Sequence, residues 1–287
     1  MNLFEILRGW DVAVFHWINA LAGRWYWLDL GLAYQEDNNL LKGAVFIAGL
    51  VWYWFRPADD LEHRRTVIVN TMVAVPVALL VNRVISFLLP FRARPLYDAS
   101  VPFIDPHVDV VVHFNLEHWS SFPSDTATYF FVMVGGLALI SRRAGLWFGL
   151  YALAFIVGTR IVLGLHYPSD IVVGAVLGFT TTLVLNALLQ RRLARRLLAL
   201  ERWRPHLFHA FSFLVFFEVA AMLEDIRHLP HDVALAAWRE AQARLQAHRS
   251  LAMIGLLCFA ALLLLTLIIA RHRAHLAKHP SRNLPSG

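Results

Sequence analysis

The sequence has few charged residues and almost no cysteine. Only 16% of its 287 residues are charged, against about 25% in an average soluble domain, while 58% are hydrophobic. A single cysteine, Cys258, excludes a disulfide framework or a thiolate metal cluster built from this chain. The formal charge of +6 comes from arginines spread among apolar runs, which favours a membrane surface over nucleic acid as the partner. The composition therefore excludes a disordered chain and indicates a membrane protein that does not bind nucleic acid.

Several apolar runs are candidates for membrane-spanning helices, because a spanning helix needs about 20 mostly apolar residues. Polar stretches separate these runs, and the fourth run is short. The sequence therefore predicts an all-α fold, a polytopic bundle of membrane helices. The runs cover residues 41–55, 67–89, 124–140, 146–159, 171–189, 207–223 and 251–270.

The two ends of the chain differ from its apolar middle. Apolar residues near the N-terminus recur at multiples of three between polar ones, which predicts an interfacial amphipathic segment. No pattern of a cleaved signal peptide is present, so we expect this segment to stay on the mature protein. The last two apolar runs are typical of an appended helical hairpin. The predicted units are the interfacial segment 1–35, a membrane core 36–190, a basic connector 191–206, the C-terminal transmembrane hairpin 207–270 and a basic tail 271–287.

Basic residues are unequally divided between the two membrane faces that these runs define. One face, which includes the connector and the tail, carries 15 Lys and Arg residues, and the other face carries 7. The positive-inside rule places the richer face in the cytoplasm. We therefore predict a multi-pass protein of the bacterial inner-membrane type, with the long polar connection 90–123 facing the periplasm or the exterior.

Three short polar stretches fall on this outer face, and their side chains suit a phosphate group. Arg92, Arg94 and Arg160 carry guanidinium groups, which match phosphate oxygens in bidentate geometry. Ser124 opens a predicted helix, where free N–H groups and the helix dipole favour an anion. These residues predict an oxyanion pocket. The stretches cover residues 92–95, 121–126 and 160–170.

His166 and Asp170 lie four residues apart, at the start of a helix predicted to begin at Pro168. The carboxylate can then reach one imidazole nitrogen and leave the other free to attack, which is the usual support for a histidine nucleophile or base. No cluster of histidines and carboxylates suggests a metal site, and arginines can supply the charge stabilisation that a cation would give. We therefore expect catalysis without a metal or another cofactor.

The same residues resemble the motifs of the type 2 phosphatidic acid phosphatases, which are Lys-x6-Arg-Pro, Pro-Ser-Gly-His and Ser-Arg-x5-His-x3-Asp. The stretch Thr159 to Asp170 reproduces the third motif at its full spacing, with Thr in place of Ser. Arg94-Pro95 matches the end of the first motif, and Pro123-Ser124 matches the start of the second. The doublet in 92–95 is similar to the Arg-Pro-Arg-Pro of bacterial undecaprenyl diphosphatases.

This resemblance covers roughly residues 67–189 and implies a lipid phosphatase core of the six-helix type. It implies hydrolysis of a polyprenyl diphosphate or a related lipid phosphate through a phosphohistidine intermediate at the outer membrane face. The substrate is then a lipid phosphate or diphosphate in contact with membrane lipids, and the sequence gives no oligomeric state. The implied site residues are His166 and Asp170 in catalysis, with Arg94, Arg160, Ser124 and Arg92 binding the phosphate.

Two positions depart from the family pattern. Phe87 stands where the first motif has Lys, and Asp125-Thr126 stands where the second has Gly-His. In the family that histidine protonates the leaving group, which Thr cannot do near pH 7. A diphosphate that leaves as lipid phosphate needs less protonation, so the departures favour a diphosphate substrate. The roles of Asp125 and Thr126 stay open.

The departures also leave other functions open. A catalytically impaired protein that binds or transports lipid phosphates is one alternative, and a lipid phosphotransferase is another. A missing proton donor could also be replaced from the preceding loop. Its titratable residues are His113, Glu117 and His118.

Overall fold

The computed structural model describes residues 3–106, 116–189 and 192–222. Helices and connecting loops make up this part of the chain, which contains no strand, so the predicted all-α membrane bundle is confirmed. The helices are α1 (Leu3–Asn19), α2 (Tyr26–Asp37), α3 (Asn39–Phe55), α4 (Leu61–Leu88), the short η1 (Pro95–Tyr97), α5 (Asp125–Ile140), α6 (Arg142–Tyr151), the π-helical η3 (Ala152–Val157), α7 (Gly158–Val162), α8 (Pro168–Leu189), α9 (Arg192–Trp203) and α10 (Pro205–Ala220).

Among the described residues, three helical segments are long and apolar enough to cross a membrane. They are α4, the continuous segment Arg142–Val162 made by α6, η3 and α7, and α8. Shorter apolar helices, α3, α5 and α10, accompany them. These segments account for six of the predicted runs, while the run 251–270 and the predicted tail lie outside the described residues.

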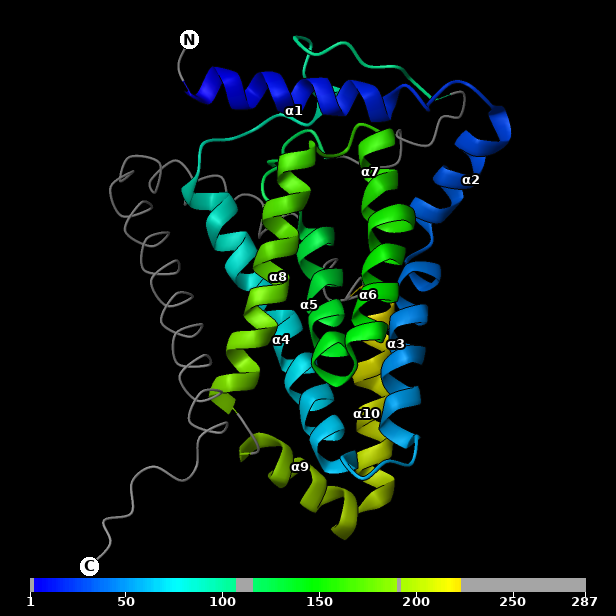
Figure 1. The fold of residues 1–287 in the computed structure, drawn as a ribbon, viewed down its shortest axis with the longest axis vertical. Coiled ribbons are helices and arrows are strands. Elements are labelled where there is room, and N and C mark those ends of the chain that lie inside the picture. Colours follow the sequence, from blue (N-terminus) through cyan, green and yellow to red (C-terminus); the bar gives the residue numbers. More distant parts are fainter. Residues whose placement is uncertain (1–2, 107–115, 190–191, 223–287) are drawn as a thin grey trace, which may run out of the picture.

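The spanning helices run along the long axis of the molecule, and α5 lies between α8 and α6 (Figure 1). The most extensive packing in the bundle is that of α5 on α8. Helix α1 lies across one end of the bundle and α9 lies across the opposite end (Figure 1). The predicted interfacial segment 1–35 thus contains α1 and most of α2, and its division from the core stays a prediction.

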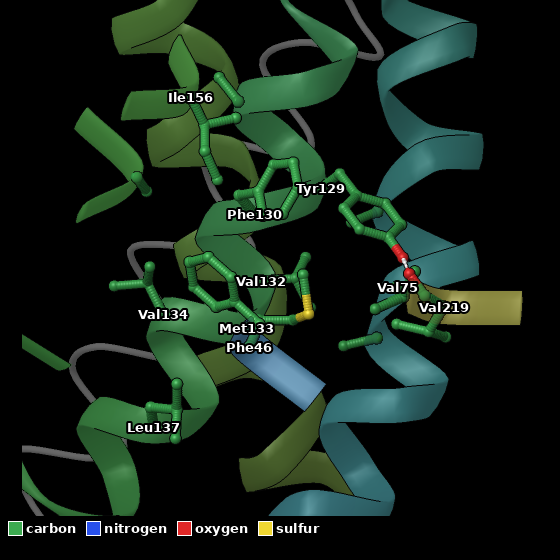
Figure 2. Close-up of a cluster of buried hydrophobic side chains, with 14 of the residues drawn as sticks. Phe46, Val75, Tyr129, Phe130, Val132, Met133, Val134, Leu137, Ile156 and Val219 are labelled. Carbon is green, nitrogen blue, oxygen red and sulfur yellow. Dashed lines mark hydrogen bonds between the residues drawn. The ribbon is translucent and has the colours of Figure 1, made fainter. Parts of the chain in front are cut away.

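The core gathers around α5 because this helix is apolar on all sides. Figure 2 shows Tyr129, Phe130 and Met133 of α5 among side chains from α3, α4 and α10. The Tyr129 hydroxyl donates to the carbonyl of Val219, which satisfies a polar group inside the core. Large apolar side chains also cover much of the outer surface, as a lipid-facing surface requires.

The first turns of α5 and α8 come into close contact, and this contact places residues of the second and third motifs together. Gly174 permits it, since a Cβ atom there would stand 2.4 Å from the carbonyl oxygen of Ser124. The Ser124 N–H donates to the backbone carbonyl of Asp170 over 3.0 Å. A side chain at residue 174 would therefore separate the two helix starts.

Candidate functional site

Four charged or titratable residues from the predicted site are buried close together, in the connections and helix ends on the side of the bundle that α1 crosses. Arg94 follows α4, Arg160 lies in α7, His166 stands in the turn after α7, and Asp170 lies in the first turn of α8. His166 and Asp170 are 1% and 0% exposed. The structure thus brings the first and third predicted stretches into one buried cluster.

The turn between α7 and α8 fixes the position of His166. Gly164 has a φ of +68°, a left-handed conformation that side chains other than glycine rarely adopt, and a Cβ there would meet the ring of Phe103. The backbone N–H groups of Leu165 and His166 donate to the carbonyl of Arg160 over 2.9 and 3.3 Å. Helix α8 then begins at Pro168, as the sequence predicts.

The hydrogen bonds of His166 define its tautomer. Its Nδ1 lies 2.8 Å from the carbonyl oxygen of Ser121 and 3.7 Å from Oδ2 of Asp170. A carbonyl oxygen can only accept, so Nδ1 carries the proton and Nε2 carries the lone pair. Nε2 lies 3.2 Å from Nη1 of Arg94. The nitrogen that could attack a substrate therefore faces an arginine.

Burial and neighbouring cations keep His166 neutral. Desolvation by burial, together with the positive charges of Arg94 and Arg160, lowers its pKa to about 4, although Asp170 acts in the opposite direction. Burial also lowers the pKa of Arg94 to about 10, which leaves that guanidinium charged at neutral pH. The cluster therefore pairs a neutral imidazole with a positive guanidinium.

Arg94 and Arg160 each have a buried Nε–H group with no hydrogen-bond partner among the described residues. Nη1 of Arg94 donates to the carbonyl of Leu165 over 2.8 Å, and Nη1 of Arg160 lies 2.6 Å from Oε1 of Glu36. Buried polar groups normally have a partner, and an unsatisfied one calls for an explanation. An anion with several oxygens beside His166 would supply the missing acceptors.

Asp170 connects His166 to Arg92. Its Oδ2 accepts the N–H of Tyr167 over 2.8 Å, and its Oδ1 lies 2.6 Å from Nη1 of Arg92. Arg92 also pairs with Asp11 of α1 and lies 4.0 Å over the ring of Tyr167. Arg92 would have to weaken these contacts in order to bind a phosphate, and its predicted role as a phosphate ligand stays a prediction.

The N-terminus of α5 holds the residues of the second predicted stretch. Ser124 caps the helix, because its Oγ accepts the N–H of Ala127 over 3.3 Å. Its own N–H and Oγ are thus used within the fold. Thr126 is buried, with Oγ1 3.4 Å from Oδ1 of Asp125, whereas Asp125 is partly exposed and lies 3.8 Å from Arg83. Any contact of Ser124 or Thr126 with a substrate stays a prediction.

The loop residues proposed as replacement acids do not join the cluster in the described part of the chain. Glu117 and His118 are exposed, and neither makes a hydrogen bond or an ion pair with the described residues of the cluster. His113 lies outside the described residues. Within the second stretch, residues 121–126, the one titratable side chain is that of Asp125, which is partly exposed.

Four charged residues near the cluster are absent from the prediction made from sequence, and one of them is Asp11, the partner of Arg92. Arg83 lies on α4 one helical turn before Phe87, stacks on Trp119, and its charge contributes to lowering the pKa of Arg94. Glu36 and Lys42 flank the break between α2 and α3 and are buried. Arg83 could have been found from the sequence, because it lies four residues before Phe87, the position where the first motif has Lys, and so on the same face of the helix. Glu36 and Lys42 could have been found because charged side chains beside an apolar run are costly to desolvate, which indicates a functional role.

A groove of about 1040 Å³ opens beside the cluster, between α1 and the start of α8. Apolar side chains form most of its wall, and Arg92, Tyr167 and Ser169 border it on the side of the cluster. Neither His166 nor Arg94 lines it. The groove is therefore adjacent to the buried histidine and does not contain it.

Fold and site together define an all-α membrane protein with histidine, carboxylate and arginine side chains buried at one end of its bundle. Residues 65–194 match the model of the PAP2 superfamily, and the chain belongs to this superfamily. Membership supports a membrane lipid phosphatase in general terms.

Two curated relatives extend this comparison. The chain is 31% identical over 163 residues to the bacitracin transport permease protein BcrC of Bacillus licheniformis, a match that covers 54% of this chain and 73% of BcrC. It is 26% identical over 179 residues to the protein named undecaprenyl-diphosphatase YbjG of Escherichia coli, covering 60% of this chain and 79% of YbjG. No solved structure matches the chain.

Proposed function

We propose that this protein hydrolyses a lipid diphosphate through a phosphohistidine intermediate on His166. One observation carries the proposal. Two buried arginines each present an Nε–H group without a partner among the described residues, beside the lone pair of a neutral imidazole. This arrangement combines a nucleophile with donors for phosphate oxygens.

Two chemical steps follow from this geometry. A phosphate oxygen replaces Nε2 of His166 as the partner of Nη1 of Arg94, and the freed Nε2 attacks the terminal phosphorus. The bridging P–O bond breaks and its electron pair leaves with the lipid phosphate. Positive charge on the ring is stabilised by Asp170 and by the Nδ1–H bond to Ser121. Water then attacks the phosphohistidine phosphorus, the P–N bond breaks and its electron pair returns to Nε2, the proton of the water passes to solvent, and inorganic phosphate is released.

A diphosphate substrate suits the second stretch better than a monoester does. Buried Thr126 offers no acid for the leaving group, and a departing lipid phosphate needs less protonation than an alkoxide. The name of the relative YbjG, which refers to undecaprenyl-diphosphatase activity, supports the same class of substrate. We therefore propose a polyprenyl diphosphate as the preferred substrate and treat phosphatidate as the weaker one.

Release of inorganic phosphate from the purified protein in detergent tests this function. Undecaprenyl diphosphate, phosphatidate and lipid A are supplied separately, each with and without EDTA. We expect the fastest release from the diphosphate and unchanged activity with EDTA, because guanidinium groups provide the charge stabilisation. Loss of activity on chelation, restored by a divalent ion, would contradict the metal-independent mechanism.

The remaining outcomes of the same assay identify the alternatives. Tight binding of a lipid phosphate without turnover of any substrate favours a binding or transport protein. Consumption of the diphosphate in the presence of a second lipid, without inorganic phosphate, favours a phosphotransferase. Either result would replace hydrolysis as the function.

We also propose that the end of the bundle carrying the site faces the periplasm or the exterior of a bacterial inner membrane. The basic amphipathic helix α9 and the connections α3–α4 and α5–α6 lie at the opposite end (Figure 1). This distribution agrees with the positive-inside rule if that opposite end is cytoplasmic.

Cysteine labelling tests this orientation. Ala99 is exposed in the connection after α4, and Asp59 is exposed in the α3–α4 connection at the other end. In a Cys258→Ser background, we expect Ala99→Cys to react with an impermeant maleimide in intact cells and Asp59→Cys to react only after lysis. The opposite pair of results would reverse the topology.

A further inference from the structure

A break between α2 and α3 brings polar residues to a buried position. The two helices are separated by Asn38, whose Oδ1 accepts the N–H of Leu41 over 2.8 Å and so caps α3. Nζ of Lys42 donates to the backbone carbonyl of Glu36 at the end of α2. The side chains thus satisfy the backbone groups that a broken helix leaves open. The break is a built feature of the fold.

Two opposite charges are buried at this break. Glu36 is 3% exposed and Lys42 is 1% exposed, and Oε1 of Glu36 lies 3.7 Å from Nζ of Lys42. The same oxygen lies 2.6 Å from Nη1 of Arg160. Removing such charges from water carries a large desolvation cost that their mutual attraction offsets only in part, so the contribution of the group to stability is small or negative. A role at the site explains its presence better than stability does.

Arg160 connects this ion group to the nucleophile. Its carbonyl accepts the N–H of His166, and its positive charge lowers the pKa of both His166 and Arg94. Its buried Nε–H has no partner within the described residues, while Nη1 is held by Glu36. The planar guanidinium is rigid, so the contact at Nη1 sets the direction of the remaining N–H groups.

We propose that Glu36, supported by Lys42, is the positioning residue for Arg160. The carboxylate holds one edge of the guanidinium and directs the free N–H groups toward the phosphate that His166 attacks. Lys42 keeps the carboxylate in place when a phosphate competes for Arg160. This inference rests on the proposed function, because it assigns the oriented guanidinium to substrate phosphate.

The neighbouring residue supplies a matched control. Oε1 of Gln35 accepts the hydroxyl of Thr159 over 2.8 Å, so Gln35 joins the same break to the residue that precedes Arg160. This contact does not touch the guanidinium. A purely structural role of the break is therefore disturbed by Gln35→Met as well as by Glu36→Gln, whereas positioning of Arg160 is disturbed by Glu36→Gln alone.

The test compares Glu36→Gln, Glu36→Asp and Gln35→Met in the full-length protein, with inorganic phosphate as the binding probe in calorimetry. We expect Glu36→Gln to weaken phosphate binding and to lower kcat by about tenfold each, since misplacement of a catalytic group by about 1 Å can cost more than this. Glu36→Asp keeps the charge and should recover part of the loss. Gln35→Met should stay within about twofold of wild type in both measurements.

A second arm asks whether Glu36 acts through Arg160. In an Arg160→Lys background, we expect Glu36→Gln to cause little further loss, because residues that act on one another are not additive. If the activity loss of the double variant equals the product of the losses in Arg160→Lys and Glu36→Gln, the proposal is overturned. If Glu36→Gln fails to fold, Lys42→Met is measured in its place, with a smaller effect expected in the same direction.

Phosphate binding separates this proposal from the proposed function. If wild type hydrolyses no lipid but Glu36→Gln weakens phosphate binding, the function is wrong and the positioning role stands. Wild type that binds no phosphate, or equal losses in Glu36→Gln and Gln35→Met, would overturn the positioning role.

Discussion

Replacing His166 by alanine is expected to lower phosphate release by about 10⁴-fold or more, the scale at which loss of a catalytic group removes turnover in hydrolases. Nε2 of His166 holds the lone pair that the mechanism needs, and the oriented arginines cannot attack phosphorus in its place. The side chain contacts Ser121, Arg94 and Asp170, and we expect its loss to leave the helices in place. Steady-state release from the diphosphate substrate measures the effect.

The control is His209→Ala, which removes an exposed histidine of α10. We expect this variant to match wild type in activity and in the temperature of thermal unfolding. We also expect the His166 variant to retain phosphate binding, because Arg94 and Arg160 remain. Residual activity within tenfold of wild type would refute the assignment of His166 as the nucleophile.

Local spacing explains why the proximity of His166 and Asp170 could be predicted from the sequence. Pro168 begins α8, so Asp170 lies within the first turn and its carboxylate faces His166. The closer partner of Nδ1 is nevertheless the carbonyl of Ser121, which is 45 residues away in the chain. A backbone acceptor in a loop leaves no trace in side-chain spacing, and only the folded chain reveals it.

The arginines show a second limit of prediction from sequence. Arg94 matches the Arg-Pro of the first motif, and Arg92 is similar only to the doublet before it, but the sequence does not show their partners. Asp11 and Asp170 hold Arg92, whereas Arg94 reaches the imidazole. The partner Asp11 comes from α1, a helix that periodicity could identify but could not place. Glu36 escaped prediction for the same reason, since its contact with Arg160 depends on how α2 packs against α7.

The pH dependence of kcat/KM should show the environment of His166. A pKa of about 4 keeps the nucleophile neutral down to low pH, so activity should fall only as the pH drops through about 4. At pH 5 the ring is then about 90% neutral, against about 3% for an imidazole with the usual pKa near 6.5, a difference of about 30-fold in active enzyme. Rates measured between pH 3.5 and 8 would locate this acid limb.

Ionisation of the substrate phosphate could produce a limb of its own, so two substrates whose phosphates titrate at different pH are compared. A limb that belongs to the enzyme stays at the same pH with both substrates, and a limb that belongs to the substrate moves.

The variant Arg94→Gln gives an independent test, because it removes the positive charge that, after burial, contributes most to the low pKa of His166. We expect its residual activity to show the acid limb at higher pH than wild type. The contrary result is a fall in kcat/KM near pH 6.5 in wild type that does not depend on the substrate and is unchanged by Arg94→Gln. It would show that burial and Arg94 do not lower the pKa of His166 in the active enzyme.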